Sequence, residues 1–190
     1  MRKNRKEQKE SCMAKWNIDP DHSVVAFSIK HMMVANLRGQ FGKISGTIDF
    51  DPANQVRSSV AATIDVTSLT TTNKKRDEHL FGATDLFDIS KYPEIVFKSA
   101  RIEMTGGNKA KVTGDLTMHG VTRQVILDAE HFGPVKSPED LGGETTIGFA
   151  ATTSLNREDF GITWNMPIEN GFLLGKDVQI TLDIEADLVE

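Results

Sequence analysis

Cysteine and long apolar segments are almost absent from this chain of 190 residues. Its single cysteine, Cys12, excludes a disulfide within the chain and a zinc site built from several thiolates. No stretch is long and apolar enough to predict a membrane-spanning helix. The charged N-terminus has no apolar run after it and so lacks the middle region of a secretory signal. These absences predict a cytoplasmic protein.

Positive charge is scarce in the body of the chain. The formal net charge is −5, but residues 1–12 carry five basic and two acidic side chains, which leaves −8 on the remainder. An acidic body lacks the clustered Lys and Arg that phosphate backbones require, so nucleic acid is excluded as a partner. We expect residues 1–13 to be a disordered basic extension and residues 14–190 to form one domain.

Alternation of apolar and polar residues with a period of two dominates the remaining sequence and predicts β-strands. The clearest example is residues 178–186, followed by 110–118. Residues 37–50 change parity, which predicts one strand with a bulge near Gly42. Polar or irregular loops are expected at 133–143 and 156–175. The other predicted strands cover residues 24–30, 60–66, 94–102, 121–130 and 147–155.

Residues 76–99 interrupt this pattern. One short helix is predicted at about 73–82, with Thr72 or Asn73 as its N-cap. A polar corner leads there into pairs of large apolar residues, and Tyr92-Pro93 then starts the next strand. This composition is typical of a lid or rim.

About eight antiparallel strands with one-sided apolar faces, one short helix and rim loops predict an all-β protein. Closing such a sheet into a lipocalin-like barrel removes its exposed edges and buries the apolar face. At this strand number the interior can be filled by side chains or can hold one small ligand. A two-sheet sandwich is the alternative architecture.

Several motifs, in order and at matching spacing from about residue 16 to the C-terminus, resemble the YceI-like family of lipid- or polyisoprenoid-binding proteins. They are Asp19-Pro20-Asp21-His22-Ser23, Arg38-Gly39-Gln40-Phe41, Arg76-Asp77-x-His79-Leu80 followed by Phe87-Asp88 and Tyr92-Pro93, Gly114-Asp115-Leu116-Thr117, Arg157-Glu158-Asp159-Phe160-Gly161, and Gly175-Lys176-Asp177-Val178.

The resemblance implies an extended lipocalin-like barrel whose long apolar cavity holds an isoprenoid or another amphiphilic chain. It also implies a homodimer, because members often form dimers. Many members are secreted with a signal peptide, and this sequence departs from the family there. The expected partner is therefore an isoprenoid, quinone or related long-chain lipid.

We expect two groups of ligand-binding residues. The cavity lining and lid would comprise Phe27, Ile64, Leu80, Phe81, Leu86, Phe87, Phe97, Leu116, Phe149, Phe160, Trp164 and Ile180. The polar head group would meet Arg38, Arg76, His79 and Arg157, because guanidinium groups match phosphate oxygens geometrically. In the alternative interpretation, Arg76 pairs with Asp77 or Asp85, and Arg157 with Glu158 or Asp159, only to satisfy a folded rim.

Motifs for metal binding and catalysis are missing from the sequence. The five histidines lack ligand spacing, and no GxSxG, GxGxxG or GxxxxGK[ST] occurs. We therefore expect a binding protein without cofactor or metal. One alternative is an enzyme on the same barrel, using His79 with Asp77 or Arg157 with Asp159 for acid–base work on a bound lipid. A filled barrel that acts as a stress-related interaction protein is another.

Overall fold

The computed structural model describes residues 13–82 and 86–189. Its one α-helix in this part of the chain is α1 (Lys74–Gly82), and its 3-10 turns are η1 (Gln55–Arg57), η2 (Val66–Ser68), η3 (Glu139–Leu141) and η4 (Arg157–Phe160). The strands are β1 (Ala14–Ile18), β2 (Val24–His31), β3 (Ala35–Phe41), β4 (Ile44–Phe50), β5 (Ser59–Asp65), β6 (Leu69–Thr70), β7 (Glu94–Gly106), β8 (Lys109–Met118), β9 (Val121–Lys136), β10 (Thr145–Asn156), β11 (Pro167–Ile168), β12 (Gly171–Phe172) and β13 (Leu174–Leu188).

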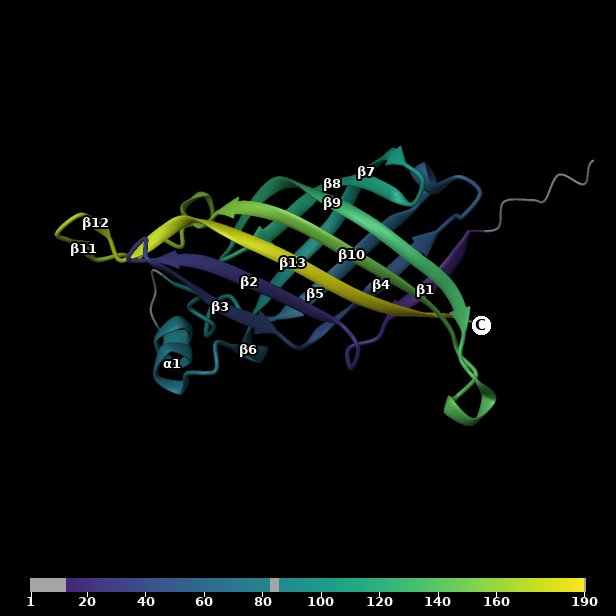
Figure 1. Ribbon diagram of the computed structural model, residues 1–190, viewed down its shortest axis with the longest axis horizontal. Coiled ribbons are helices and arrows are strands. Elements are labelled where there is room, and N and C mark those ends of the chain that lie inside the picture. The colour runs from purple at the N-terminus through teal and green to yellow at the C-terminus, as the bar shows by residue number, and fades with distance from the viewer. Residues whose placement is uncertain (1–12, 83–85, 190) are drawn as a thin grey trace, which may run out of the picture.

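The sheet closes on itself into a barrel, so the barrel prediction is confirmed and the sandwich is wrong. The strand order is β1-β4-β5-β7-β8-β9-β10-β13-β2-β3-β6, and β1 pairs antiparallel with both β4 and β13 across the seam. In the described chain the closed circuit β1-β4-β5-β7-β8-β9-β10-β13 contains eight strands, and β2, β3 and β6 continue the sheet beside β13. The barrel is elongated, with α1 and the β11–β12 hairpin at one end and β1 at the other (Figure 1).

The bulge predicted near Gly42 is wrong. The strand path breaks at residues 42 and 43, because β3 pairs with β2 and β6 whereas β4 pairs with β1 and β5. The loop predicted at 133–143 is also shorter than expected. Strand β9 continues to Lys136, where it still pairs with Thr145 of β10. Strands β1 and β6 were not predicted, because five and two residues are too few for a pattern.

Helix α1 forms where the sequence predicts it. The side-chain oxygen of Asn73 accepts a hydrogen bond of 3.1 Å from the backbone N–H of Arg76, which confirms the predicted N-cap. Asp77 in the first turn suits the positive end of the helix dipole and also accepts from the backbone N–H of Thr71 at 2.9 Å. None of the helix residues is fully buried. The helix therefore lies against the barrel end rather than inside it.

Strand β1 brings the largest buried side chain of its end into the core. Trp16 is buried and faces Ile48 of β4 and Leu188 of β13 in the sheet register. Ile147 and Ala186, on β10 and β13, are also fully buried near this seam. Burial of these side chains stabilises the closed form by roughly 1.5–3 kcal/mol for each large one. The seam therefore closes by apolar packing as well as by backbone hydrogen bonds.

Candidate functional site

A cavity of about 660 Å³ occupies the interior of the barrel. Residues from every wall strand line it, and most of them are apolar. Three lining alanines, Ala110, Ala129 and Ala151, lie side by side in the register of β8, β9 and β10. Their short side chains leave space where leucines would fill the lumen. The barrel is therefore hollow, which contradicts the filled-barrel alternative.

A glycine sets the position of one aromatic ring in the lining. Gly39 of β3 faces Phe27 of β2 in the register. A Cβ atom on Gly39 would lie 2.4 Å from Cζ of Phe27, far inside van der Waals contact. The Phe27 ring therefore lies across Gly39, along the wall rather than out into the cavity. A larger residue at position 39 would push the ring into the lumen.

Helix α1 brings polar side chains to one end of the cavity, which we call the helix end. Arg76 and His79 line the cavity there, together with Arg38 of β3. The Arg76 guanidinium donates from Nε to Oγ1 of Thr71 at 2.7 Å and from Nη2 to the Thr71 carbonyl at 2.9 Å. These bonds fix the guanidinium beside the lumen without using a carboxylate.

Arg157 is the most unusual residue of the helix end, because its side chain is buried. Only 4% of its surface is exposed. Its guanidinium donates to three backbone carbonyls of the loops around it, from Nε to Gly175 at 2.9 Å, and from Nη1 to Ile162 at 2.6 Å and Trp164 at 3.0 Å. Arg157 thereby holds together the segment that follows η4 and the start of β13.

One amino group of this guanidinium makes no hydrogen bond to the described chain. Nη2 of Arg157 is buried and has no hydrogen-bond partner among the described residues. Burial lowers the pKa of the guanidinium, and nearby Glu158 partly offsets the shift, although an arginine keeps its charge in proteins. The Glu158 carboxylate itself pairs with Lys176 at 2.8 Å. The lining residue Arg157 therefore carries a buried positive charge with one unpaired amino group.

All but two of the predicted site residues line the cavity. Those that do are Phe27, Ile64, Leu80, Leu86, Phe87, Phe97, Leu116, Phe149, Trp164, Ile180, Arg38, Arg76, His79 and Arg157. Phe160 is instead 2% exposed in the core, because η4 turns its ring away from the lumen. Phe81 is partly buried and packs against the core. Asp85, an expected partner of Arg76, lies outside the described residues.

The proposed carboxylate partners of the arginines are not used in the described part of the chain. Arg76 binds Thr71, and Arg157 binds main-chain carbonyls. The catalytic pairs of the enzyme alternative are likewise not joined by a hydrogen bond there. Asp77 accepts from Thr70 and Thr71, while the His79 ring packs edge-on against Trp164 with 4.7 Å between centroids. Among the described residues of the helix end, neither catalytic pair of the enzyme alternative is therefore assembled.

A second polar group lies at the far end of the cavity, and sequence reasoning missed it. Gln55, Asn108, Glu130 and His131 all line this end. Nε2 of His131 lies 3.1 Å from Nε2 of Gln55, and the Asn108 amide donates to Glu130 at 3.0 Å. Burial lowers the pKa of His131, because desolvation disfavours the charged ring, and nearby Glu130 partly offsets the shift. The sequence did contain a signal for His131, because position 131 continues the alternation that points residues 127 and 129 of β9 into the barrel.

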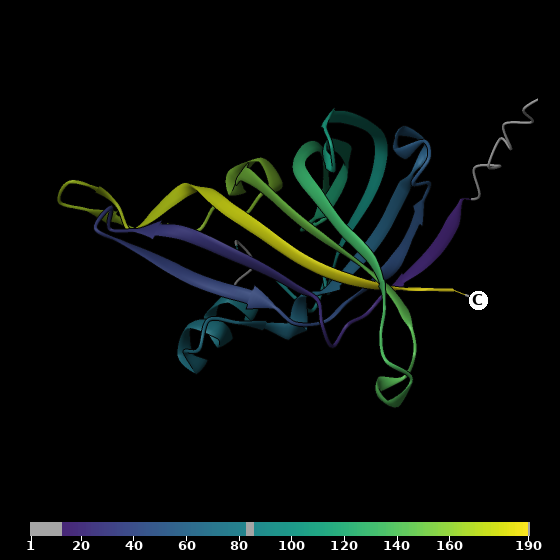
Figure 2. The same ribbon diagram turned by 45° about the vertical axis from the view of Figure 1, so that its right-hand side comes forward.

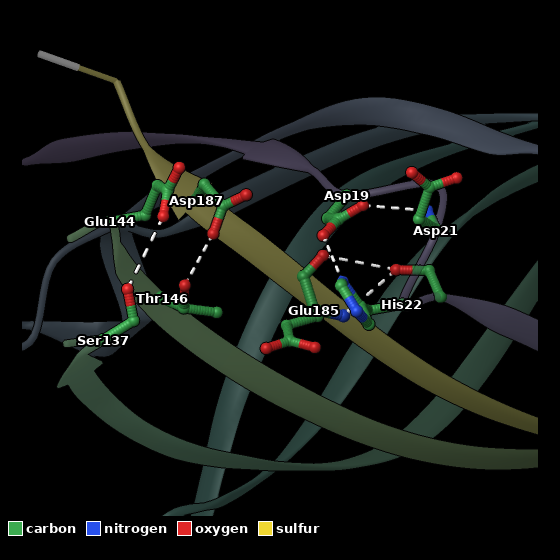
Figure 3. A network of polar contacts seen from close by, with 9 residues as sticks. Asp19, Asp21, His22, Ser137, Glu144, Thr146, Glu185 and Asp187 are labelled. Carbon is green, nitrogen blue, oxygen red and sulfur yellow. Dashed lines mark hydrogen bonds and ion pairs between the residues drawn. The ribbon is translucent and has the colours of Figure 1, made fainter. Parts of the chain in front are cut away.

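The first family motif forms a polar cluster outside the cavity. Figure 3 shows Asp19 and His22 in the turn between β1 and β2, beside Glu185 of β13. The Asp19 carboxylate lies 2.6 Å from Nδ1 of His22, and Ser23 bonds both the N–H and the carbonyl of Glu185. The hydrogen bond between the Asp19 carboxylate and the His22 ring lowers the pKa of Asp19 and raises the pKa of His22. This motif therefore ties the turn to the sheet and does not contact the lumen.

Two other classes of feature are absent from the described residues. No group of three or more His, Cys, Asp or Glu side chains lies close enough together there to hold a metal ion. No helix of the described chain has the length and apolar character needed to cross a bilayer. The cavity, with polar groups at both ends, is the candidate binding site of the barrel.

An elongated eight-stranded barrel with a deep apolar cavity defines a lipocalin-like class of protein. Within that class, the chain belongs to the YceI-like domain family, which matches residues 16–186. A UPF0312 protein of Vibrio cholerae is 38% identical over 141 residues, covering 74% of this chain and 72% of that protein. A UPF0312 protein of Pseudomonas putida is 39% identical over 155 residues, covering 80% and 79%.

Solved structures show the same barrel. BcnA of Burkholderia cenocepacia superimposes with a TM-score of 0.77 at 28% identity, covering 88% of this chain and 98% of that one. The YCEI protein of Campylobacter jejuni gives a TM-score of 0.70 at 32% identity, covering 85% and 90%. A polyisoprenoid-binding domain from Saccharophagus degradans gives a TM-score of 0.66 at 14% identity, covering 94% of this chain and 100% of that one. At this identity the likeness supports a shared fold and nothing further.

Proposed function

We propose that this protein binds one long-chain amphiphile inside the barrel and sequesters or carries it. The single observation behind this proposal is the apolar cavity of about 660 Å³ with polar groups at its ends. Its volume falls in the range of small-molecule binding sites, and its lining is that of a site for an apolar chain. An isoprenoid, a quinone or a related lipid has this combination of a long apolar chain and one polar head.

The volume sets the scale of the ligand. At about 30 Å³ for each water-sized unit, 660 Å³ accommodates roughly twenty non-hydrogen atoms. Each buried CH₂ group contributes about 0.8 kcal/mol before the entropic costs of binding are subtracted. Affinity should therefore rise steeply with chain length until the cavity is full and then level off.

The head group is proposed to lie at the helix end. Arg157 supports this placement because it adds a buried positive charge to the lining there. Arg38, Arg76 and His79 line the same end. A phosphate or a carbonyl oxygen of the head group would accept hydrogen bonds from these side chains, and a charged acceptor would do so more strongly. The protein would act by binding alone, without turnover.

Two further predictions accompany this proposal. A cytoplasmic location and a homodimer are proposed from the sequence and from the family resemblance. The Saccharophagus domain is described as polyisoprenoid-binding, and it shares the fold with this chain. That description motivates prenyl lipids as the first ligands to test.

Titration with two prenyl ligands of equal chain length, one phosphorylated and one a neutral quinone, tests the proposal. Trp164 lines the cavity and serves as a fluorescent reporter. We expect both ligands to bind and to saturate at one per chain. Arg76→Ala should weaken the phosphorylated ligand about ten-fold more than the quinone, because only the phosphate exploits the guanidinium charge.

Arg101→Ala is the matched control. Arg101 is an exposed arginine of β7 that pairs with Glu103 and does not line the cavity. Its loss should leave both affinities unchanged. Equal losses for the two ligands in Arg76→Ala would refute the phosphate contact, and an absence of binding by the native protein would refute the lipid-binding function.

A further inference from the structure

Five large apolar side chains project into water beyond the helix end. Two turns supply them, the β2–β3 turn with Met32, Met33 and Val34, and the β11–β12 hairpin with Met166 and Phe172. Their exposed fractions are 44%, 56%, 81%, 52% and 54% in that order. We call these five residues the apolar rim. A cluster of this kind on a protein surface marks an interaction site.

The two turns form one surface. The backbone N–H of Met32 donates to the carbonyl of Leu173 at 2.7 Å, and the N–H of Leu173 donates to the carbonyl of Met166 at 2.9 Å. Figures 1 and 2 show both turns extending together from the same end of the barrel, near α1. The apolar rim is therefore a single patch at the tip of the molecule.

This patch continues into the cavity. His31 and Leu173, the chain neighbours of Met32 and Phe172, line the lumen, as does Leu174 at the start of β13. A lipid chain that leaves the cavity at the helix end would meet the apolar rim before it meets water. The rim is thus placed to receive a chain from an apolar phase.

Backbone strain indicates that these side chains serve a purpose. Met32 and Met33 have φ angles of +52° and +61°, in the left-handed region that large side chains avoid. Glycine or asparagine would fit the turn with less strain. Two methionines that are both strained and exposed contribute little to folding, and strain of this kind concentrates at functional sites.

The charges around the rim suit an anionic surface. Lys30, Arg38, Lys75 and Arg76 have no ion-pair partner among the described residues. Lys30 lies beside the rim residue Met33. Both flank Gly175, because Cβ of Lys30 is 3.1 Å and Cε of Met33 is 3.6 Å from the position that a Cβ of Gly175 would take. Glu169, in the turn between β11 and β12, is the acidic residue within the rim turns. The two segments that carry the rim, residues 30–38 and 166–174, thus hold two basic residues, Lys30 and Arg38, against Glu169, a net charge of +1 on an otherwise acidic protein.

We propose that the apolar rim inserts into the head-group region of an anionic lipid bilayer and docks the helix end there. Apolar side chains framed by Lys and Arg are the combination that binds such interfaces. Docking lets the lipid pass between bilayer and barrel without crossing water. This inference rests on the lipid-binding function proposed above.

Vesicle flotation with the full chain tests the docking. The rim variant combines Met33→Asn, Val34→Thr and Phe172→Ser. The control combines Ile126→Ser, Phe132→Ser and Val135→Thr, three β9 residues with exposed fractions of 50%, 50% and 67% that lie away from the rim. Both keep the basic N-terminal residues, so that any attraction from those charges is equal. We expect binding to phosphatidylglycerol vesicles to fall at least ten-fold in the rim variant and to stay unchanged in the control.

Lipid transfer gives the second measurement. A fluorescent prenyl lipid should leave vesicles for the rim variant at least ten-fold more slowly than for the native protein. A short-chain prenyl phosphate offered free in water should bind both proteins equally.

If the native protein binds that probe but not vesicles, docking is refuted and the lipid-binding function stands. If it binds neither, the lipid-binding function fails. A native dimer that dissociates in the rim variant, with vesicle binding unchanged, would assign the rim to a second copy instead.

Discussion

His79 of α1 meets the edge of the Trp164 indole, with 4.7 Å between the ring centroids. This contact joins the helix to the loop whose carbonyls bind Arg157. Both rings line the cavity. The pair therefore connects the two segments between which a ligand at the helix end would pass.

Replacing His79 should loosen that connection. We expect His79→Ala to release bound prenyl lipid several-fold faster, because α1 loses its aromatic contact with the Trp164 loop. Stopped-flow displacement, followed by Trp164 fluorescence, measures the rate. His22→Ala, which alters a histidine outside the cavity, should release lipid at the native rate. An unchanged rate in His79→Ala would mean that this contact does not limit release.

Gly39→Ala should destabilise the barrel and narrow its cavity. The new Cβ would lie 2.4 Å from Phe27, so the ring must move into the lumen. We expect a loss of about 1–3 kcal/mol in the free energy of unfolding and weaker binding of long chains. Gly42→Ala is the control, because nothing lies within 4 Å of its Cβ position. Denaturant unfolding would contradict this account if both variants were equally stable.

Arg157→Met should cost about 3 kcal/mol of stability. The change leaves the carbonyls of Gly175, Ile162 and Trp164 without their buried donor, and unsatisfied buried groups are expensive. Arg123→Met removes an exposed arginine and should change stability by less than about 0.5 kcal/mol. Thermal and denaturant unfolding check the difference. A stable Arg157→Met variant would show that water satisfies those carbonyls.

Acid should destabilise the protein through His131. Burial lowers the pKa of this histidine in the folded state below its value in the unfolded chain, which is about 6.5. As the pH falls below that value, the unfolded chain takes up the proton first, so stability decreases. His131→Gln should therefore reduce the fall in melting temperature between pH 7.5 and pH 5.

His22 should show the opposite sign and serves as the comparison. Its hydrogen bond with Asp19 raises its pKa in the folded state. The stability that it contributes is fully present below the pKa of the unfolded chain and is lost as the pH rises through the raised value. His22→Asn should thus weaken the protein near pH 6 and leave it unchanged at pH 9. Identical pH profiles for the native protein and both variants would contradict these assignments.

Local patterns predicted the wall of the barrel well because each strand carries its own signal. Residues 178–186 alternate throughout, and β13 contains them. Asn73 was one of two predicted N-caps of the helix, and it does cap α1. The features that the sequence did not predict depend on contacts between segments far apart in the chain. The break between β3 and β4 depends on which neighbours each half pairs with, and β1 is defined by the seam that it closes.

The site was predictable in composition but not in bonding. Alternation and the family motifs placed most of the lining, yet Phe160 follows Arg157 in a 3-10 turn, where strand parity does not apply. The partners of Arg157 are carbonyls as distant as Gly175, and backbone groups leave no trace in a sequence. The apolar rim was likewise not predictable, because its methionines form one patch only through the contact between the β2–β3 turn and the β11–β12 hairpin.

The most direct measurement is native mass spectrometry of the freshly purified protein, followed by organic extraction. The account predicts one lipid per chain, with extraction identifying its chain and head group. Ala129→Phe, which adds a ring to the cavity lining, should lose that mass, whereas Thr152→Phe on the exposed outer face should keep it. A native protein that is empty, and that also fails to bind added prenyl lipids, would contradict the central claim.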